Sequence, residues 1–156
     1  MSDFEIKGLA ELNAALQELP AKIEANVLRG ALRAGQKVIL DKARSNINNR
    51  TGDLSKSLRI RTSKRGGNVS AMLIAGDKKA YYPHMVEKGT VKHFIKPKAA
   101  KSLFFAGLFG EVVDHPGAAP KPFMRPALDS EQTNAAEAVR DYIATRLPKE
   151  IKKAGK

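Results

Sequence analysis

Hydrophobic residues recur along the chain with two different periods, one helical and one extended. Phe4 and Ile6 alternate with charged residues and predict a short strand, and leucines at steps of three and four then predict a helix over residues 9–19. From Pro20 to about Ser45 the apolar positions share one helical face. At 1.5 Å per residue this second helix would be about 39 Å long, so we expect it to form the backbone of the fold.

Two glycines, Gly30 and Gly35, lie inside this long helix, where each costs about 1 kcal/mol relative to alanine. Ala31 and Ala34 lie next to them in the sequence. The cluster of small residues predicts that another element, such as a sheet, packs closely against the helix. Simple tolerance of the glycines is the alternative.

The middle of the chain has the alternation that is typical of strands. Residues 58–63 and 69–75 alternate between apolar and other positions on either side of Gly66-Gly67, which predicts an antiparallel hairpin. A single helical turn is expected between Tyr81 and Gly89. Residues 94–98 should be extended, and residues 102–109 are apolar enough to form a strand or a strand pair.

The segment from Asp114 to Leu128 contains four prolines, which fix φ and remove backbone donors. This composition predicts a stiff loop that is neither strand nor helix until its end. Such a loop could present Phe123 and Met124 as a docking point for a neighbouring subunit, whereas a simple connector is the alternative.

The order of elements predicts one α+β domain over residues 1–148, with a long N-terminal helix packed on a small antiparallel β-sheet and a C-terminal helix. The last helix should begin near Arg125 and end before Pro148, leaving residues 149–156 as a flexible basic tail. A length of 156 residues with 42% hydrophobic content is ordinary for one domain. We expect no secretory leader and no membrane association, because no apolar run approaches the roughly 18 residues of a membrane span.

The net charge of +12 is concentrated in residues 47–128, which carry 15 Lys and Arg against 5 Asp and Glu. This segment is a candidate basic surface for phosphates or for an acidic protein neighbour, and a solvated face is the plainer interpretation. Sequence-nonspecific DNA binding is therefore the alternative function. The basic candidates are Arg59, Arg61, Lys64, Arg65, Lys78 and Lys79.

The sequence shows no arrangement of residues that is typical of catalysis or metal binding. Its three histidines, His84, His93 and His115, lack metal-ligand spacing with a second histidine or a carboxylate, and there is no cysteine. Neither a nucleophile elbow nor a phosphate-binding glycine loop is present. We therefore expect a protein that is not an enzyme and that needs no metal or cofactor.

Three segments in a fixed order resemble a known family: Tyr82–Thr90, His93–Phe105 and His115–Leu128. Together they are similar to the gene-10-like minor tail components of lambda-like, long-tailed bacteriophages. The resemblance extends from residue 9 to about 147. It departs from the family pattern at Lys88-Gly89, where an aromatic residue usually precedes the glycine.

This resemblance implies a non-enzymatic head-tail joining, or tail completion, subunit of the virion neck that is assembled in the host cytoplasm. Its partners would be its own copies in a ring, a hexamer rather than a dodecamer, together with the head connector or stopper and the tail terminator or tail tube. DNA would pass through the channel. The basic surface would then face an acidic neighbour rather than DNA. Candidate subunit contacts are Tyr82, His84, Glu87, Thr90, His115, Pro116, Gly117, Phe123, Met124 and Arg125.

Overall fold

The structure is a computed structural model that describes residues 21–48, 51–97, 103–105, 108–110 and 112–154. The predicted strand and helix before residue 20 lie outside these residues. In chain order the elements are α2 (Ala21–Asn46), α3 (Asp53–Ser57), β1 (Arg59–Arg65), β2 (Asn68–Ile74), α4 (Pro83–Lys88), β3 (His93–Ile95), β4 (Leu103–Phe105), β5 (Leu108–Gly110), β6 (Val113–His115) and α5 (Met124–Ala154). The predicted α+β class is confirmed.

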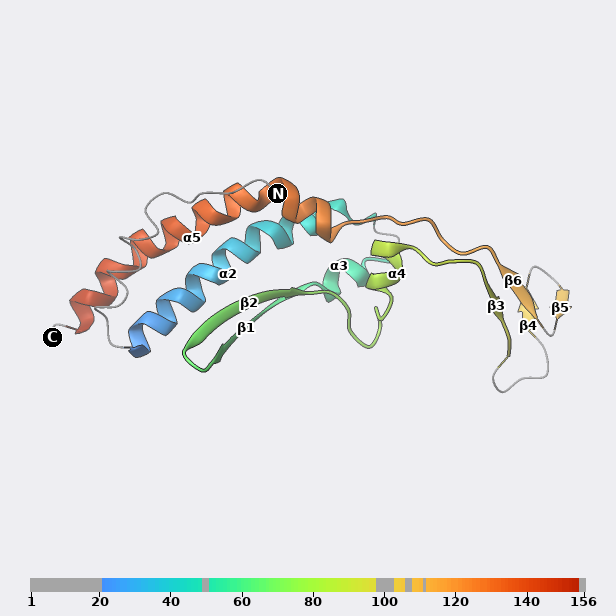
Figure 1. Ribbon diagram of the computed structural model, residues 1–156, viewed down its shortest axis with the longest axis horizontal. Helices are drawn as coiled ribbons and strands as arrows, with labels where there is room; N and C mark the ends of the chain where they lie inside the picture. The colour runs from blue at the N-terminus through green and yellow to red at the C-terminus, as the bar shows by residue number, and fades with distance from the viewer. Residues whose placement is uncertain (1–20, 49–50, 98–102, 106–107, 111, 155–156) are drawn as a thin grey trace.

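The two long helices α2 and α5 lie side by side and form one end of an elongated molecule (Figure 1). The predicted course of α2 is confirmed to within one or two residues. Towards its N-terminal end, Val27 and Ala31 are buried against Ile143 of α5. An amphipathic helix of this length is stabilised mainly by packing of its apolar face, and here α5 supplies part of that packing.

Close packing at Gly30 and Gly35 is confirmed, but the partner is α5 and not a sheet. A Cβ on Gly35 would lie 2.7 Å from Cγ2 of Val139 and 2.9 Å from the carbonyl oxygen of Ala135. At Gly30, the ring of Tyr142 occupies the space that a side chain would need. Glycine at these positions lets the two helices approach more closely than larger residues would allow.

The hairpin of β1 and β2 packs against α2, as Figure 1 shows below that helix. Its antiparallel register runs from Arg59 opposite Ile74 to Arg65 opposite Asn68, so the predicted hairpin is confirmed. The half-buried side chains Ile60 and Leu73 pack on the main core cluster.

The main core lies at the C-terminal end of α2, where several elements meet. Its buried side chains come from α2, α3, the segments that follow these helices, and the start of α5: Ile39, Leu40, Ala43, Ile47, Leu54, Leu58, Phe123, Ala127 and Ala135. The segment that contains β3, β4, β5 and β6 begins and ends next to this core. The core therefore fixes where that segment starts and where it returns.

The prediction that the last helix ends before Pro148 is wrong, because α5 continues through this proline to Ala154. A proline inside a helix removes one hydrogen bond and crowds the preceding turn, but packing on both sides can hold the helix together. Leu147 packs on the Val27 cluster, and Arg146 forms an ion pair of 2.8 Å with Glu150 across the proline. Residues 149–154, expected as a flexible tail, are therefore helical. No helix in the described part of the chain is long and apolar enough to cross a membrane.

Gly35→Ala tests the close contact between the helices. Alanine gains about 1 kcal/mol of helix propensity, but its Cβ would meet the Ala135 carbonyl and Val139. We expect a net loss of about 1–2 kcal/mol in the free energy of unfolding, measured by chemical denaturation. The matched control is Lys37→Ala on the exposed side of α2, which should change stability by less than about 0.5 kcal/mol. Equal stability of the two variants would contradict the close packing.

Candidate functional site

The candidate site is an arm that projects from the body between α4 and α5 (Figure 1). We define the arm as the described residues 89–97 and 112–120, with the β4–β5 hairpin beyond them. β3 and β6 are antiparallel, with His93 opposite His115. Nearer the body, the amide of Thr90 donates to the Ala118 carbonyl at 2.9 Å, and the Ala118 amide donates back to the Thr90 carbonyl at 3.0 Å.

These strands confirm most of the extended structure predicted for the arm and overturn one expectation. Of the residues 94–98 predicted to be extended, Phe94 and Ile95 lie in β3, and the strand pair predicted over 102–109 is confirmed by β4 and β5. The proline-rich segment, however, begins in a strand, because Asp114 and His115 belong to β6 and Ala118 bridges to Thr90. Its prolines follow or lie between the paired residues, so they remove no donor from the ladder.

Glu87 joins the arm to the body. Its Oε2 accepts hydrogen bonds from the backbone N–H groups of Phe123 at 2.8 Å and Met124 at 3.0 Å, and its Oε1 accepts one from Arg125 at 3.0 Å. These amides lie at the start of α5, where the first N–H groups have no partner within the helix. The carboxylate therefore acts as a cap supplied by α4, which its charge and the helix dipole both favour. We call Glu87 and residues 123–125 the joint.

The pKa of Glu87 reflects this environment. Partial burial raises the pKa, but the three backbone hydrogen bonds and the nearby charge of Arg125 outweigh it and hold the pKa below the ordinary value of 4.5. The ionised form is thus favoured in the folded protein.

Phe123 is core and not a docking group, which corrects the expectation from the sequence. Its ring is 1% exposed and packs in the main core. Asn46 donates to the Phe123 carbonyl at 3.2 Å, and the amide of Lys121 donates to the Val86 carbonyl at 2.8 Å. These bonds turn the returning chain inward before α5 begins, so the ring enters the body. Met124 is half-buried against the same cluster.

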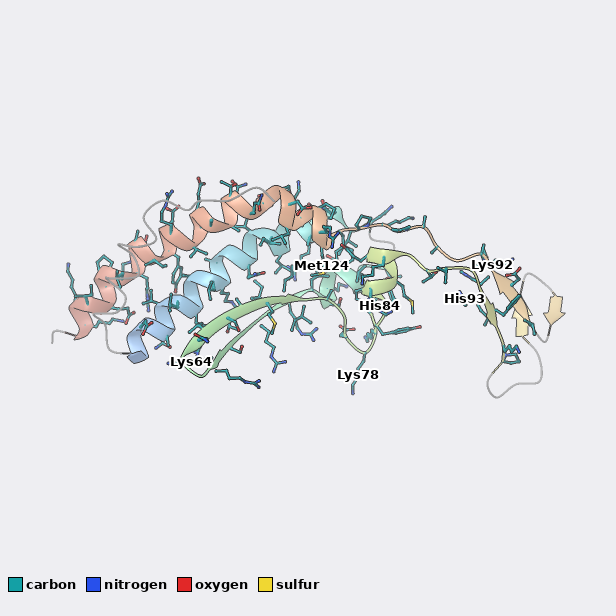
Figure 2. The ribbon with its side chains drawn as sticks, in the orientation of Figure 1. Lys64, Lys78, His84, Lys92, His93 and Met124 are labelled. Atoms are coloured by element: carbon teal, nitrogen blue, oxygen red, sulfur yellow. The ribbon has the colours of Figure 1, made fainter. Side chains whose placement is uncertain are left out.

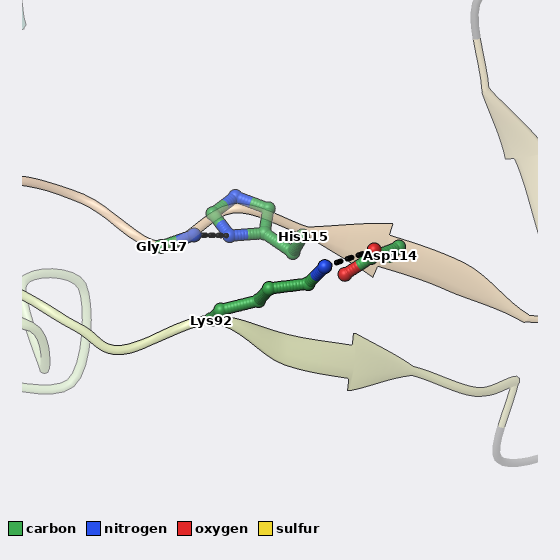
Figure 3. A network of polar contacts seen from close by, with 4 residues as sticks. All are labelled: Lys92, Asp114, His115 and Gly117. Carbon is green, nitrogen blue, oxygen red and sulfur yellow. Dashed lines mark hydrogen bonds and ion pairs between the residues drawn. The ribbon is translucent and has the colours of Figure 1, made fainter.

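Gly117 allows the two sides of the arm to meet at its root. Its φ of +87° is in the region that favours glycine, and a Cβ there would collide with the Thr90 carbonyl oxygen. Its amide donates to Nδ1 of His115 at 3.0 Å (Figure 3). That nitrogen therefore carries a lone pair, which assigns the proton of the neutral ring to Nε2.

A pair of histidines and an ion pair lie on opposite faces of the arm. The rings of His93 and His115 stack with centroids 5.0 Å apart. On the other face, Nζ of Lys92 contacts Asp114 at 2.7 Å (Figure 3). Among the described residues, no group of three or more histidine, cysteine or acidic side chains is arranged to hold a metal ion.

The arm exposes large apolar side chains that the sequence reasoning did not identify. Val91 is 84% exposed, Phe94 67% and Val112 47%. The alternation of residues 91–95 could have shown which positions share a face. It could not have shown that both faces of the arm point away from the body. An isolated two-stranded ribbon is marginally stable in water, so such side chains favour burial by a partner.

The structure distributes the candidate contact residues over two regions. The arm root brings together Thr90, His115, Pro116 and Gly117, and the joint holds Glu87 with Met124 and Arg125. Tyr82 lies at the start of α4 and packs on the core, whereas His84 and Arg125 are exposed. Their role in binding another subunit stays a prediction.

The basic candidates follow the hairpin and the loop after it. Arg59, Arg61 and Arg65 lie on the outer face of β1, and Figure 2 shows Lys64 near the hairpin tip and Lys78 beyond its other end. Arg59 also has a structural role, since its Nη1 donates to the Gly76 carbonyl at 2.6 Å. The structure thus places these residues along an extended ribbon and not in one compact patch.

Comparison with known families matches residues 10–89 to the HK97-gp10-like family, described as "Bacteriophage HK97-gp10, putative tail-component". The matched part contains α2, the β1–β2 hairpin and α4, and it ends at the residue where the arm begins. No curated protein and no solved structure matches the chain.

Glu87→Gln tests the cap. Glutamine keeps the shape but offers one acceptor oxygen and no charge, so we expect unfolding to become easier by about 1–3 kcal/mol at pH 7. Because the pKa of Glu87 is lowered in the folded state, its stabilisation is present above pH 4.5 and is lost as the pH falls through the folded-state value. The difference between the proteins should therefore shrink on acidification. Chemical denaturation at several pH values measures this difference in the free energy of unfolding. Glu137→Gln on the exposed side of α5 is the control.

Gly117→Ala tests the arm root. Strain of about 1–3 kcal/mol should speed hydrogen exchange of the Thr90 and Ala118 amides roughly ten- to a hundredfold. The body should keep its protection. Gly67→Ala is the matched control, because Gly67 has a nearly equal φ of +85° but no atom within 4 Å of its added Cβ. Unchanged exchange at Thr90 and Ala118 in Gly117→Ala would show that the close approach does not hold the arm.

Proposed function

The chain belongs to the HK97-gp10-like family of bacteriophage tail components, and from this membership we propose that it is a tail completion subunit of the virion neck. Copies of the chain form a ring, with six subunits, that joins the portal-connector complex to the tail tube and leaves a channel for DNA. The chain contributes contacts and catalyses no reaction.

The projecting arm is the observation that supports a ring. A ring whose subunits associate head to tail requires two different surfaces on each copy. The arm offers a slender surface with exposed Val91 and Phe94, and the paired helices of the body offer a broad one. The joint connects these surfaces through short hydrogen bonds, so the arm would leave each subunit in a defined direction.

Sequence-nonspecific DNA binding is the second candidate, since Arg59, Arg61 and Arg65 share the exposed face of β1. Such binding would rest on phosphate contacts and should fall steeply with added salt. A retardation assay with duplex DNA decides this candidate. Complexes that form at low salt and weaken steeply as salt is added support it, whereas the absence of any complex at low salt removes it.

We expect the purified chain, alone or with connector and tail proteins, to assemble into a particle of about six times 17.0 kDa in light scattering. Replacing residues 91–116 by a short glycine-serine link should abolish assembly and leave the helical body folded. The control, Lys37→Ala on the exposed side of α2, should assemble normally. A wild-type chain that stays monomeric at every concentration and with every neck partner would contradict the ring.

A further inference from the structure

We infer that one face of the arm docks on the outer surface of α5 in the next copy of the chain. This inference rests on the proposed ring and names the two surfaces that meet in it. The first surface, which we call the strip, consists of Lys92, Phe94 and Lys96. The second, which we call the ridge, consists of Asp129, Thr133 and Glu137.

The strip follows from the pleat of the arm. Residues two apart in an extended strand point to the same side, which places Lys92, Phe94 and Lys96 together. The ion pair between Lys92 and Asp114 supports this placement, because Asp114 is directly opposite Phe94 in the ladder. All three strip residues are exposed. The strip therefore presents an aromatic ring between two cations.

The ridge follows from the period of α5. Residues four apart lie on one side of a helix, and Asp129, Thr133 and Glu137 are all exposed on the side away from α2. From Pro126 to Val139 this helix carries three acidic residues and no lysine or arginine, although the whole chain has a net charge of +12. Within this helical stretch the ridge offers an acidic surface that a basic copy could bind.

The two surfaces match in spacing as well as in charge. Four residues of strand place Lys92 and Lys96 about 13 Å apart. Eight residues of helix place Asp129 and Glu137 about 12 Å apart. Phe94 lies between the cations and the small Thr133 between the acids, so the ring can approach the helix while the charges meet on either side.

Lys92 pairs with Asp114 in its own arm, but the aromatic ring of the strip is left uncovered by the described part of its own subunit. Phe94 is 67% exposed on an arm that points away from the body. Buried aromatic side chains surrounded by polar contacts carry most of the energy of many interfaces, and charge complementarity selects the partner. A second copy supplies the acidic ridge and, through its own strip, continues the ring.

Cysteine cross-linking tests the contact, because the chain contains no cysteine. Val112 directly precedes β6, the strand that pairs with β3, and it is not part of the strip. The variant Val112→Cys/Thr133→Cys therefore keeps the strip intact. A short bis-maleimide should convert the assembled variant into a ladder of covalent oligomers. The control Val112→Cys/Ser70→Cys, which places the second thiol on the outer face of β2, should give no ladder. Each single-cysteine variant should give no species larger than a dimer.

Charge reversal provides a second measurement. Lys96→Glu should weaken assembly at low salt at least tenfold, as should Asp129→Lys/Glu137→Lys. A chain carrying all three changes should regain part of the lost assembly, because position 96 again meets an opposite charge while Asp114 offsets the charge of Lys92. Lys37→Glu on α2 should have no effect. If the wild type assembles but neither the ladder nor the rescue is seen, the arm binds another surface and this inference is overturned while the ring stands. A wild type that remains monomeric with all its neck partners overturns both proposals.

Discussion

The carboxylate of Glu87 is the contact on which the arrangement of the whole molecule depends. It binds the first amides of α5 from the end of α4, and so fixes the point at which the returning chain becomes helix. From this point α5 can run antiparallel to α2 and place Ala135 and Val139 over Gly35. The same bonds hold Phe123 in the core. One side chain therefore fixes the place where the arm ends and α5 begins.

The arm differs from the body in what stabilises it. Side chains buried between helices hold the body together, whereas at the arm root backbone hydrogen bonds, the close approach of Gly117 and a histidine pair hold two strands that bury little. A ribbon of this kind gains stability when another surface covers it. Assembly would therefore order the arm further, and part of the binding free energy would offset that ordering.

Local patterns in the sequence were sufficient for α2, the β1–β2 hairpin and α4, because each depends on periodicity and turn residues within a short segment. The failures concern contacts between distant segments. The glycines at 30 and 35 indicated close packing but could not reveal α5 as the partner. Prolines around Phe123 suggested an exposed loop, whereas bonds from Asn46 and Glu87 turn that ring inward. Packing of Leu147 and the Arg146–Glu150 ion pair stabilise α5 on both sides of Pro148. Phe94 is exposed because no described element packs over it, and the hydrophobic periodicity of its own segment cannot show this.

A strong positive charge limits how copies of this chain can associate. Subunits with a net charge of +12 repel one another at distances within the Debye length of about 8–10 Å. A contact between the strip and the ridge would reduce this repulsion where the copies approach most closely, since it pairs cations with the acidic half of α5. The cations of the β1–β2 hairpin would remain outside that contact. They would then face an acidic neighbouring ring, so that one part of the charge would direct contacts within the ring and the other would direct contacts between rings.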